Sequence, residues 1–395
     1  MKRVLCLYPN PAGFSGQRAA TELVMHLLLE GDRTSWDFVE LKMPGFPKAE
    51  VSPAEKIRYG IQLFGCYPRA LGLALFRRRN IDCLYANLSQ ARFGLFREGI
   101  VLWIFRWLRP GTRLVVSLHG SVFQTWEKEC LERSLLTNLI RHATTVTVLG
   151  PSQKKTLEEW GLSPDQILVV PNTCEIVALG EEELIAKHQT DETAVGAAED
   201  PLRVLHLSTL MEPKGFPMVV EGWQRWVENR TDPTELVICG NFATSSFDER
   251  FSTLVEARRW IEGQVENSKG RMRWIEGARG EAKRKLFADA HVFVFPSTYP
   301  VEAQPLVLLE AMASGCAIIA TQVGEIPYMV SRKEAWLLPC QPTAEDVVEA
   351  LAALQDADLR LSLAKAARRR YLEMFSPRVY QNSWRALLGA VDEGR

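Results

Sequence analysis

Two glutamates, Glu302 and Glu310, lie eight residues apart in the region of the chain best suited to chemistry. An apolar run at 292–295 predicts a buried strand, a loop follows it, and 305–314 predicts a helix with proline near its first turn. In a parallel sheet this order places the loop and the helix N-terminus at the carboxyl ends of the strands, where backbone N–H groups can bind phosphate. The spacing of the two glutamates is not specific by itself, since two solvated carboxylates would show it as well.

A lysine and a glycine, Lys214 and Gly215, follow a second expected strand at 204–208 and precede an expected helix. A Rossmann-like unit handles phosphate at this kind of loop. A lysine at this position can neutralise charge that develops on a phosphate oxygen in a dry cleft. The alternative is an ordinary solvated loop lysine.

Three further residues are candidates because they follow strands directly. His119 comes after the expected strand at 114–118, and this strand-end position favours a functional role over a purely structural one. Gly13 and Gly16 lie in the loop PNPAGFSGQ, where glycine lets the backbone approach a ligand closely. An ordinary strand-to-helix turn would explain the two glycines equally well.

The chain as a whole alternates strands, loops and helices, which predicts α/β layers with parallel sheets. We expect two Rossmann-like domains, at 1–175 and 201–375, with an acidic segment at 176–200 that we interpret as a linker and mobile surface segment. The expected strands are 4–8, 37–41, 83–86, 114–118, 145–149 and 167–170 in the first domain and 204–208, 236–239, 273–275, 292–295, 317–320 and 335–338 in the second.

The sequence from 293 to 329 resembles the signature of the retaining glycosyltransferases of family 4, also called glycosyl transferases group 1. The resemblance rests on Pro296 and Ser297, on Glu302, on PLVLLEAMA at 305–313, and on the two following segments GCAIIAT and GEIP. It implies the GT-B architecture, in which two Rossmann-like domains face a central cleft and a C-terminal helix, here about 376–395, crosses back onto the first domain.

The resemblance also implies an activity. A family member transfers a sugar from a nucleoside-diphosphate sugar to an acceptor hydroxyl with retention of the anomeric configuration, and the departing phosphate helps to deprotonate the acceptor. We expect no metal ion and no cofactor, because neither a DxD sequence on a strand-end loop nor a His/Cys set with ligand spacing is visible. A retaining glycosidase would instead need two carboxylates ~5 Å apart across the scissile bond.

Roles for individual residues follow from the resemblance. Glu302 would contact the donor sugar, Glu310 the ribose hydroxyls, and the N–H groups near Leu306 and Val307 the diphosphate. Backbone atoms at 277–278 would contact the base. The implied catalytic residues are Lys214, Glu302 and His119, and the implied donor-binding residues are Gly13, Gly16, Thr209, Gly277, Ala278, Gln304, Pro305, Leu306, Val307 and Glu310.

One departure from the family pattern concerns charge. The family usually has an arginine where this chain has Thr209. Charge compensation would then fall to Lys214, to backbone donors, and to Arg18 or Arg279.

Composition is typical of a large soluble enzyme. The 395 residues are 47% hydrophobic, enough for a core in each of two or three domains. No run of ~18 apolar residues predicts a spanning helix, and the N-terminus is too weakly apolar for a signal peptide. The eight cysteines form no CxxC pair, which favours a reducing compartment. We therefore expect cytoplasmic residence.

Charge is distributed unevenly along the chain. Residues 1–175 hold 22 Lys and Arg against 16 Asp and Glu, and 54–113 alone hold 11 against 3, interleaved with apolar and aromatic residues. Such a stretch could lie on an anionic membrane surface at the inner face of a membrane. Two ordinary helices that bury an apolar face under arginine stems are an equally good explanation. Nucleic acid is disfavoured because no recognition module is present.

Two other functions remain open at this stage. A sugar-nucleotide epimerase of the same architecture would need no acceptor, but its different carboxylate pattern is not evident. A non-catalytic sugar-nucleotide-binding protein is suggested by Thr209 and by EAQP at 302–305, where EGFG is common in the family. The basic region at 54–113 leads us to expect a glycan or glycolipid acceptor of the cell envelope. The sequence specifies neither the base nor the sugar of the donor.

Overall fold

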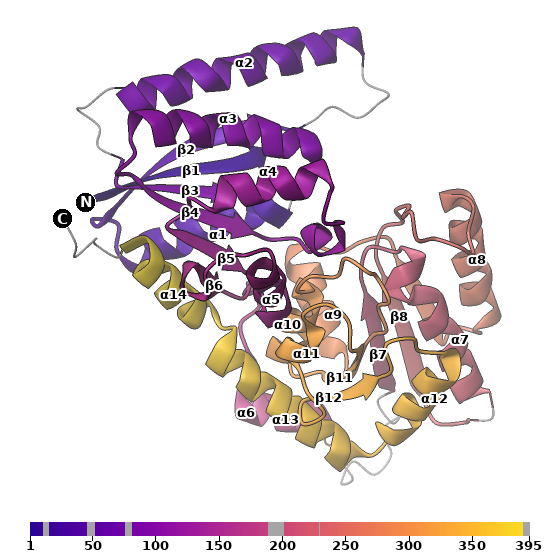
Figure 1. Ribbon diagram of the computed structural model, residues 1–395. Helices are drawn as coiled ribbons and strands as arrows, with labels where there is room; N and C mark the ends of the chain where they lie inside the picture. Colours follow the sequence, from indigo (N-terminus) through magenta and orange to yellow (C-terminus); the bar gives the residue numbers. More distant parts are fainter. Residues whose placement is uncertain (11–15, 46–51, 76–80, 189–200, 229, 390–395) are drawn as a thin grey trace. The chain divides into compact units, whose positions relative to one another are not determined.

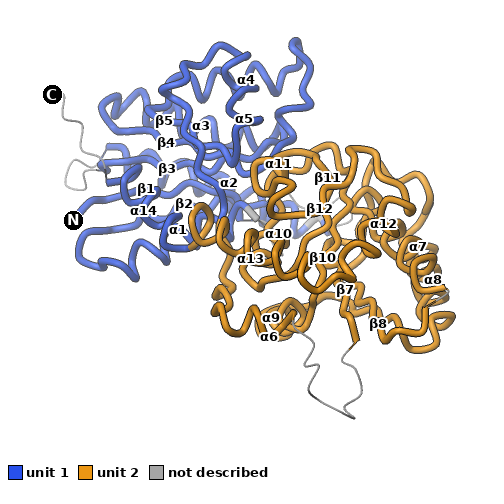
Figure 2. The backbone as a smooth tube through the Cα atoms, turned by 90° about the horizontal axis from the view of Figure 1, so that it is seen from below, with its two compact units in different colours: residues 1–172, 377–395 blue, residues 173–376 orange. Residues whose placement is uncertain are grey.

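The protein divides into two compact units (Figure 2). We describe them from a computed structural model, which places residues 1–10, 16–45, 52–75, 81–188, 201–228 and 230–389. Unit 1 comprises Met1–Asn172 and Pro377–Arg395, and unit 2 comprises Thr173–Ser376.

Unit 1 is built on a parallel six-stranded sheet in the order β2-β1-β3-β4-β5-β6 (Figure 1). This is the order of a doubly wound sheet, in which the strand direction of travel reverses between β1 and β3. The strands are β1 (Lys2–Asn10), β2 (Trp36–Pro44), β3 (Cys83–Asn87), β4 (Arg113–Leu118), β5 (Thr145–Val148) and β6 (Ile167–Val169).

Helices cover both faces of this sheet, so alternate residues of a strand enter different cores. In β1, Leu5 and Leu7 join one buried cluster and Val4 and Cys6 join the other. The helices of unit 1 are α1 (Gly16–Gly31), α2 (Pro53–Leu75), α3 (Arg92–Leu108), α4 (Leu131–Ile140), α5 (Pro151–Glu159) and α14 (Pro377–Gly389), with short 3-10 turns η1 (Val122–Thr125) and η2 (Pro164–Gln166).

Unit 2 contains a second parallel six-stranded sheet, in the order β12-β11-β10-β7-β8-β9. Counted within the unit, this is the Rossmann order 3-2-1-4-5-6, and the direction of travel reverses between β7 and β10. The strands are β7 (Leu202–Leu207), β8 (Thr234–Cys239), β9 (Met272–Ile275), β10 (Val292–Phe295), β11 (Ala317–Thr321) and β12 (Ala335–Leu338).

The helices of unit 2 connect these strands and bury both faces of the sheet in two separate clusters. They are α6 (Glu181–His188), α7 (Phe216–Val227), α8 (Leu254–Asn267), α9 (Gly280–Asp289), α10 (Leu306–Ala313), α11 (Ile326–Met329), α12 (Ala344–Ala353) and α13 (Ala357–Met374), with the 3-10 turn η3 (Glu212–Lys214).

The predicted fold class, α/β with two Rossmann-like domains, is confirmed, and each of the twelve expected strands is present. The first half of the segment 176–200, which the sequence predicted as an acidic linker, is structured and belongs to unit 2. Residues 181–188 form α6, which packs against α13 inside unit 2, with the side chain of Lys187 donating to Ser314 O at 2.8 Å. The remaining residues of that segment, 189–200, lie outside the described residues.

The C-terminal helix α14 belongs to unit 1. Its Trp384 is 1% exposed and meets the ring of Tyr85 in β3 edge-on, with 5.0 Å between ring centroids. The guanidinium of Arg113 donates to Leu387 O at 2.9 Å. Helix α14 therefore completes a core of unit 1 to which β1 also contributes.

In the described residues, no helix combines the length and the apolar character that crossing a membrane requires.

Replacement of Trp384 by alanine should destabilise unit 1 by about 3–5 kcal/mol, because a buried indole leaves a cavity when it is removed. Urea unfolding followed by circular dichroism would show the transition of unit 1 at lower urea. Asn382→Ala on the exposed side of the same helix is the matched control and should leave the transition in place. An unchanged transition in Trp384→Ala would contradict the assignment of α14 to this core.

Candidate active site

The point where unit 2 reverses its strand order brings two loops together. The loop after β7 contains η3 and Lys214, and the loop after β10 contains Glu302. Open α/β sheets bind ligands in the crevice beyond the carboxyl ends of the two strands at such a point. The topology alone therefore places the predicted lysine and the predicted glutamate at one site.

An ion pair joins the two loops. Lys214 Nζ lies 2.5 Å from Glu302 Oε2, and the same oxygen accepts a hydrogen bond from Ser297 Oγ at 2.9 Å. The two charged side chains are only 14% and 7% exposed. The ammonium also lies 4.7 Å from the ring centroid of Tyr299. A buried pair of this kind gains little net stability, but removal of one partner leaves an uncompensated charge and is costly.

Two glycines allow close backbone approaches around this pair, Gly215 between the two loops and Gly324 between the loop after β11 and the loop that carries Glu302. Gly215 has φ +85°, and a Cβ there would lie 2.6 Å from Pro296 O. Gly324 has φ +55°, and a Cβ there would lie 2.0 Å from Glu302 O. Only glycine combines a left-handed backbone with contact this close. The loops are further joined by the N–H of Thr298, which donates to Pro213 O at 2.7 Å.

Glu310 lies in the second turn of α10 and is 8% exposed. Its Oε1 lies 2.5 Å from Lys283 Nζ, which α9 supplies, and its Oε2 has no hydrogen-bond partner among the described residues. Burial raises the pKa of Glu310, and the neighbouring Lys283 opposes that rise. A buried carboxylate oxygen without a partner is costly unless a ligand donates to it. Glu310 Oε2 is therefore suited to accept a hydrogen bond from a ligand hydroxyl.

The N-terminus of α10 is formed by the residues that the sequence predicted for a diphosphate. Pro305 is the N-cap residue, and its side chain makes no capping hydrogen bond. Leu306 is 38% exposed, whereas Gln304 is buried. Val307 packs against the unit 2 core. A helix N-terminus with uncapped N–H groups favours an anion.

The predicted base-contacting residues lie on the loop after β9. Gly277 has φ +77°, and a Cβ there would lie 2.6 Å from the side-chain amide of Asn241, so the loops after β8 and β9 also approach closely. Ala278 is partly buried. Thr209 is exposed on the loop after β7, and its neighbour Ser208 is buried against His206 Nε2 at 2.9 Å.

Of the remaining predicted residues, which all belong to unit 1, His119 lies at the carboxyl end of β4. Gly16 begins α1, and Gly13 lies outside the described residues. His119 follows β4, with its Nδ1 3.0 Å from Ser117 Oγ. Thr147 Oγ1 donates to Ser117 Oγ, and donation by the serine hydroxyl to Nδ1 would place the ring proton of His119 on Nε2.

Burial lowers the pKa of His119 to about 4. The imidazole is therefore neutral at physiological pH, and its one ring N–H can donate a hydrogen bond without carrying a charge. A neutral donor of this kind suits a sugar hydroxyl better than a phosphate. The sequence analysis named Arg18 and Arg279 as further cations for charge compensation. Arg18 is on α1 of unit 1, whereas Arg279 is the exposed N-cap residue of α9 in unit 2.

Lys283 is a site residue that the sequence reasoning missed. It is one of several basic residues in the run AKRKLF, and nothing in that run distinguishes the lysine that faces α10 from those that face solvent. Ser297, quoted only as part of a motif, also has a definite role as a donor to Glu302. Among the described residues, no group of three or more His, Cys, Asp and Glu side chains is arranged to hold a metal ion.

Comparison with known proteins agrees with this geometry. Two family models match, "Glycosyl transferase 4-like domain" over residues 15–173 and "Glycosyl transferases group 1" over residues 187–370. A curated relative, the putative colanic acid biosynthesis glycosyltransferase WcaL of Escherichia coli strain K12, is 27% identical over 205 residues, which are 50% of this chain. The match spans about half of that relative as well, 47% of its length.

Solved structures of similar fold cover the whole chain. Anabaena HepE, crystallised with UDP and glucose, has a TM-score of 0.68 at 14% identity and covers 99% of this chain and 100% of its own. Sucrose-phosphate synthase of Thermosynechococcus elongatus has a TM-score of 0.63 at 18% identity, with the same coverage. The two Rossmann-like units have the GT-B fold of these structures, and the two family models identify a glycosyltransferase. Because the two family models together span most of its length, the chain belongs to the glycosyl transferases group 1.

Gly215→Ala should destabilise unit 2 by about 2–4 kcal/mol, because a left-handed alanine costs about 1–2 kcal/mol and the clash with Pro296 O adds to that cost. Gly270 offers a matched control, since its φ is +83° and a Cβ there meets nothing within 4 Å. Thermal and urea unfolding of the two alanine variants should show the smaller loss for Gly270→Ala. Equal losses would mean that the loop approach at Gly215 carries no strain.

The low pKa of His119 should make unit 1 less stable at acidic pH. The folded pKa of about 4 lies below the ordinary 6.5, so protons favour the unfolded state as the pH falls from 6.5 to 4. His119→Gln should flatten this decline in unit 1, measured as the urea midpoint at several pH values. Replacement of the exposed His26 by glutamine is the control. A decline of unchanged size in His119→Gln would show that His119 is not desolvated as described.

Proposed function

We propose that the protein transfers a sugar from a nucleoside-diphosphate sugar to an acceptor hydroxyl with retention of configuration and without a metal ion. The observation that carries this proposal is the buried Lys214–Glu302 pair at the strand-order reversal of unit 2. A charged lysine held there without solvent suits a phosphate leaving group, because a fixed cation stabilises charge that develops in the transition state.

Each part of the donor has a chemically matching group in unit 2. The diphosphate fits the uncapped N-terminus of α10 together with the ammonium of Lys214. The ribose hydroxyls fit the unsatisfied oxygen of Glu310, which Lys283 holds in place. The sugar fits Glu302, whose carboxylate is positioned by Lys214 and Ser297.

The proposal of retention rests on the ion pairs that Glu302 and Glu310 already form. Glu310 is paired with Lys283 inside the core, so the two glutamates do not form the opposed pair that a double-displacement glycosidase requires. In a front-face reaction, the bond from the anomeric carbon to the phosphate oxygen breaks, the acceptor oxygen attacks from the same side, and its proton passes to the departing phosphate. Lys214 neutralises that phosphate.

The names of the relatives give the proposal its substrate classes. HepE was crystallised with UDP and with UDP-glucose, and WcaL is named for colanic acid biosynthesis. We therefore propose a uridine-diphosphate sugar as the first donor to test and a cell-envelope glycan or glycolipid as the acceptor class. The basic region at 54–113 would hold the protein as a peripheral component at the cytoplasmic face of an anionic membrane.

The proposal predicts distinct defects for the two ends of the donor site. Glu310→Gln should weaken nucleotide binding by about 10–100-fold, because it removes a charged hydrogen-bond acceptor. Lys214→Ala should lower the rate of sugar transfer or donor hydrolysis by about 10²–10³-fold. Thermal-shift screening with UDP-, GDP- and ADP-sugars, followed by turnover assays with the responsive donor, measures both.

The solvent-exposed Lys285, which pairs with Asp289 on α9, supplies the control variant Lys285→Ala. It should retain both binding and turnover. Absence of a shift with every nucleotide sugar would favour a different ligand, and conversion of the donor sugar without an acceptor would favour an epimerase.

A further inference from the structure

One outer surface of unit 1 exposes large apolar side chains in a regular pattern. On α2 these are Ile57, Ile61, Phe64, Leu71 and Leu75, which are between 42% and 73% exposed. Their spacings of three, four or seven residues place them on one side of the helix. A soluble surface helix normally exposes charged residues on that side, so this stripe needs a partner.

The neighbouring helix α3 repeats the pattern. Its exposed apolar residues are Phe93, Phe96, Ile100, Trp103 and Trp107, spaced by three and four residues, and Trp107 is 89% exposed. The opposite side of α3 is buried against the sheet. Both helices contribute their buried sides to the same core cluster, so both stripes point away from the same face of the sheet.

The two stripes form one surface because α2 and α3 pack side by side in unit 1 (Figure 1). We call it the α2–α3 face, defined by the ten exposed apolar residues named above. Its exposed charges are mostly basic. Lys56, Arg58, Arg69, Arg92 and Arg106 are exposed on the two helices beside the stripes, whereas Glu55 is the exposed acidic residue of the two helices in the part of the chain described.

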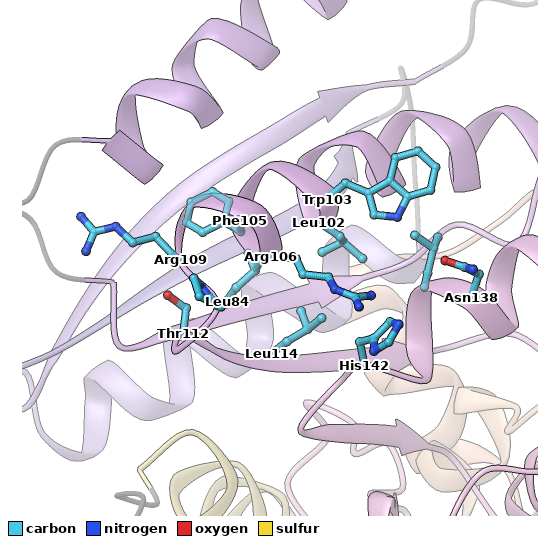
Figure 3. A pocket seen from close by; sticks show the side chains of 12 residues that line it. Leu84, Leu102, Trp103, Phe105, Arg106, Arg109, Thr112, Leu114, Asn138 and His142 are labelled. Atoms are coloured by element: carbon cyan, nitrogen blue, oxygen red, sulfur yellow. The ribbon is translucent and has the colours of Figure 1, made fainter. Parts of the chain in front are cut away.

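A pocket opens beside the α2–α3 face, between α3 and α4. Figure 3 shows Arg106, Asn138 and His142 gathered near Trp103, whose indole also belongs to the exposed stripe. The inner wall of the pocket is apolar and includes Leu102. A guanidinium at the mouth of an apolar pocket matches a phosphate group attached to a hydrocarbon chain.

We propose that the α2–α3 face lies in the surface of an anionic phospholipid bilayer, with its apolar stripes among the upper acyl chains and a lipid phosphate at Arg106. Amphipathic helices with aromatic residues on one side and flanking cations bind membranes in this way. The inference rests on the proposed function and deepens it, because a membrane surface would bring the protein to a glycolipid acceptor.

Charge decides between a membrane and a second copy of the chain. A symmetric dimer through the α2–α3 face would bring the same five exposed cations of both copies together, and like charges at close range repel. An anionic lipid surface would neutralise them instead. The face is therefore complementary to lipid and not to itself.

Vesicle flotation of the full-length protein tests this proposal. Protein should float with vesicles of phosphatidylglycerol and phosphatidylcholine, should float poorly with phosphatidylcholine alone, and should be partly released by 0.5 M salt, since ~1 kcal/mol per basic residue near the surface is screened. The double variant Phe64→Ser/Trp107→Ser should lower the partition coefficient by about tenfold or more, because both residues are exposed apolar anchors.

Matched control variants in unit 2 test whether vesicle binding is specific to the α2–α3 face. Val177→Ser/Val255→Ser removes two exposed apolar residues from unit 2, at 87% and 57% exposure, and should leave flotation unchanged. Arg58→Glu/Arg69→Glu should weaken flotation by more than about tenfold, whereas Arg259→Glu/Lys333→Glu in unit 2 should not. Circular dichroism confirms that every variant is folded.

Three results would overturn the proposal. They are no flotation with anionic vesicles at low salt, equal losses in the control variants, and a dimer in solution that Phe64→Ser/Trp107→Ser dissociates. Competition by inorganic phosphate without any effect of the apolar variants would indicate a free-phosphate site instead. Nucleotide thermal shifts on the same samples keep the two proposals distinct, because the donor site is in unit 2 and should respond normally whether or not the protein floats.

Discussion

The candidate active site depends on how closely two strand-end loops can approach at the reversal of strand order in unit 2. A lysine after β7 and a glutamate after β10 can form a buried pair only if the loop backbones come within van der Waals contact. Gly215 permits this, since a Cβ there would overlap Pro296 O, and Gly324 permits a similar approach of the loop after β11 to Glu302 O. The chemistry of the site is thus a consequence of backbone geometry.

Both carboxylates of this site are held by lysines from other elements. Glu302 is paired with Lys214, and Glu310 with Lys283. Such pairs fix positions more than they stabilise the fold, because desolvation of the charges offsets their attraction. Lys283, from α9, balances the charge of Glu310, and Lys214, from η3, balances that of Glu302. Each carboxylate thus has its own cation.

Much of the fold could be predicted because buried parallel strands are short continuous apolar runs between turn residues. The apolar runs VFVF at 292–295 and AWLL at 335–338 predict strands with the same bounds as β10 and β12. Gly315, which follows the last residues of α10, is predicted to end that helix in the same way. The linker prediction was weaker because GEEEL is acidic like a disordered segment. In the structure, Leu184 of this segment is buried and Lys187 reaches backbone carbonyls of unit 2, contacts that no local pattern reveals.

The same limit separates the residues of the site that could be predicted from those that could not. Lys214 and Glu302 were accessible to sequence reasoning because each sits on a short loop directly after a strand, and strand ends are brought together by topology alone. Lys283 was not, since its partner is set by the packing of α9 against α10, and helix packing fixes which of several lysines faces inward only in three dimensions. The exposed stripes of α2 and α3 show the same limit. In the sequence of α3, apolar residues lie on both sides of the helix, and only the structure shows which side fills the core and which side is exposed.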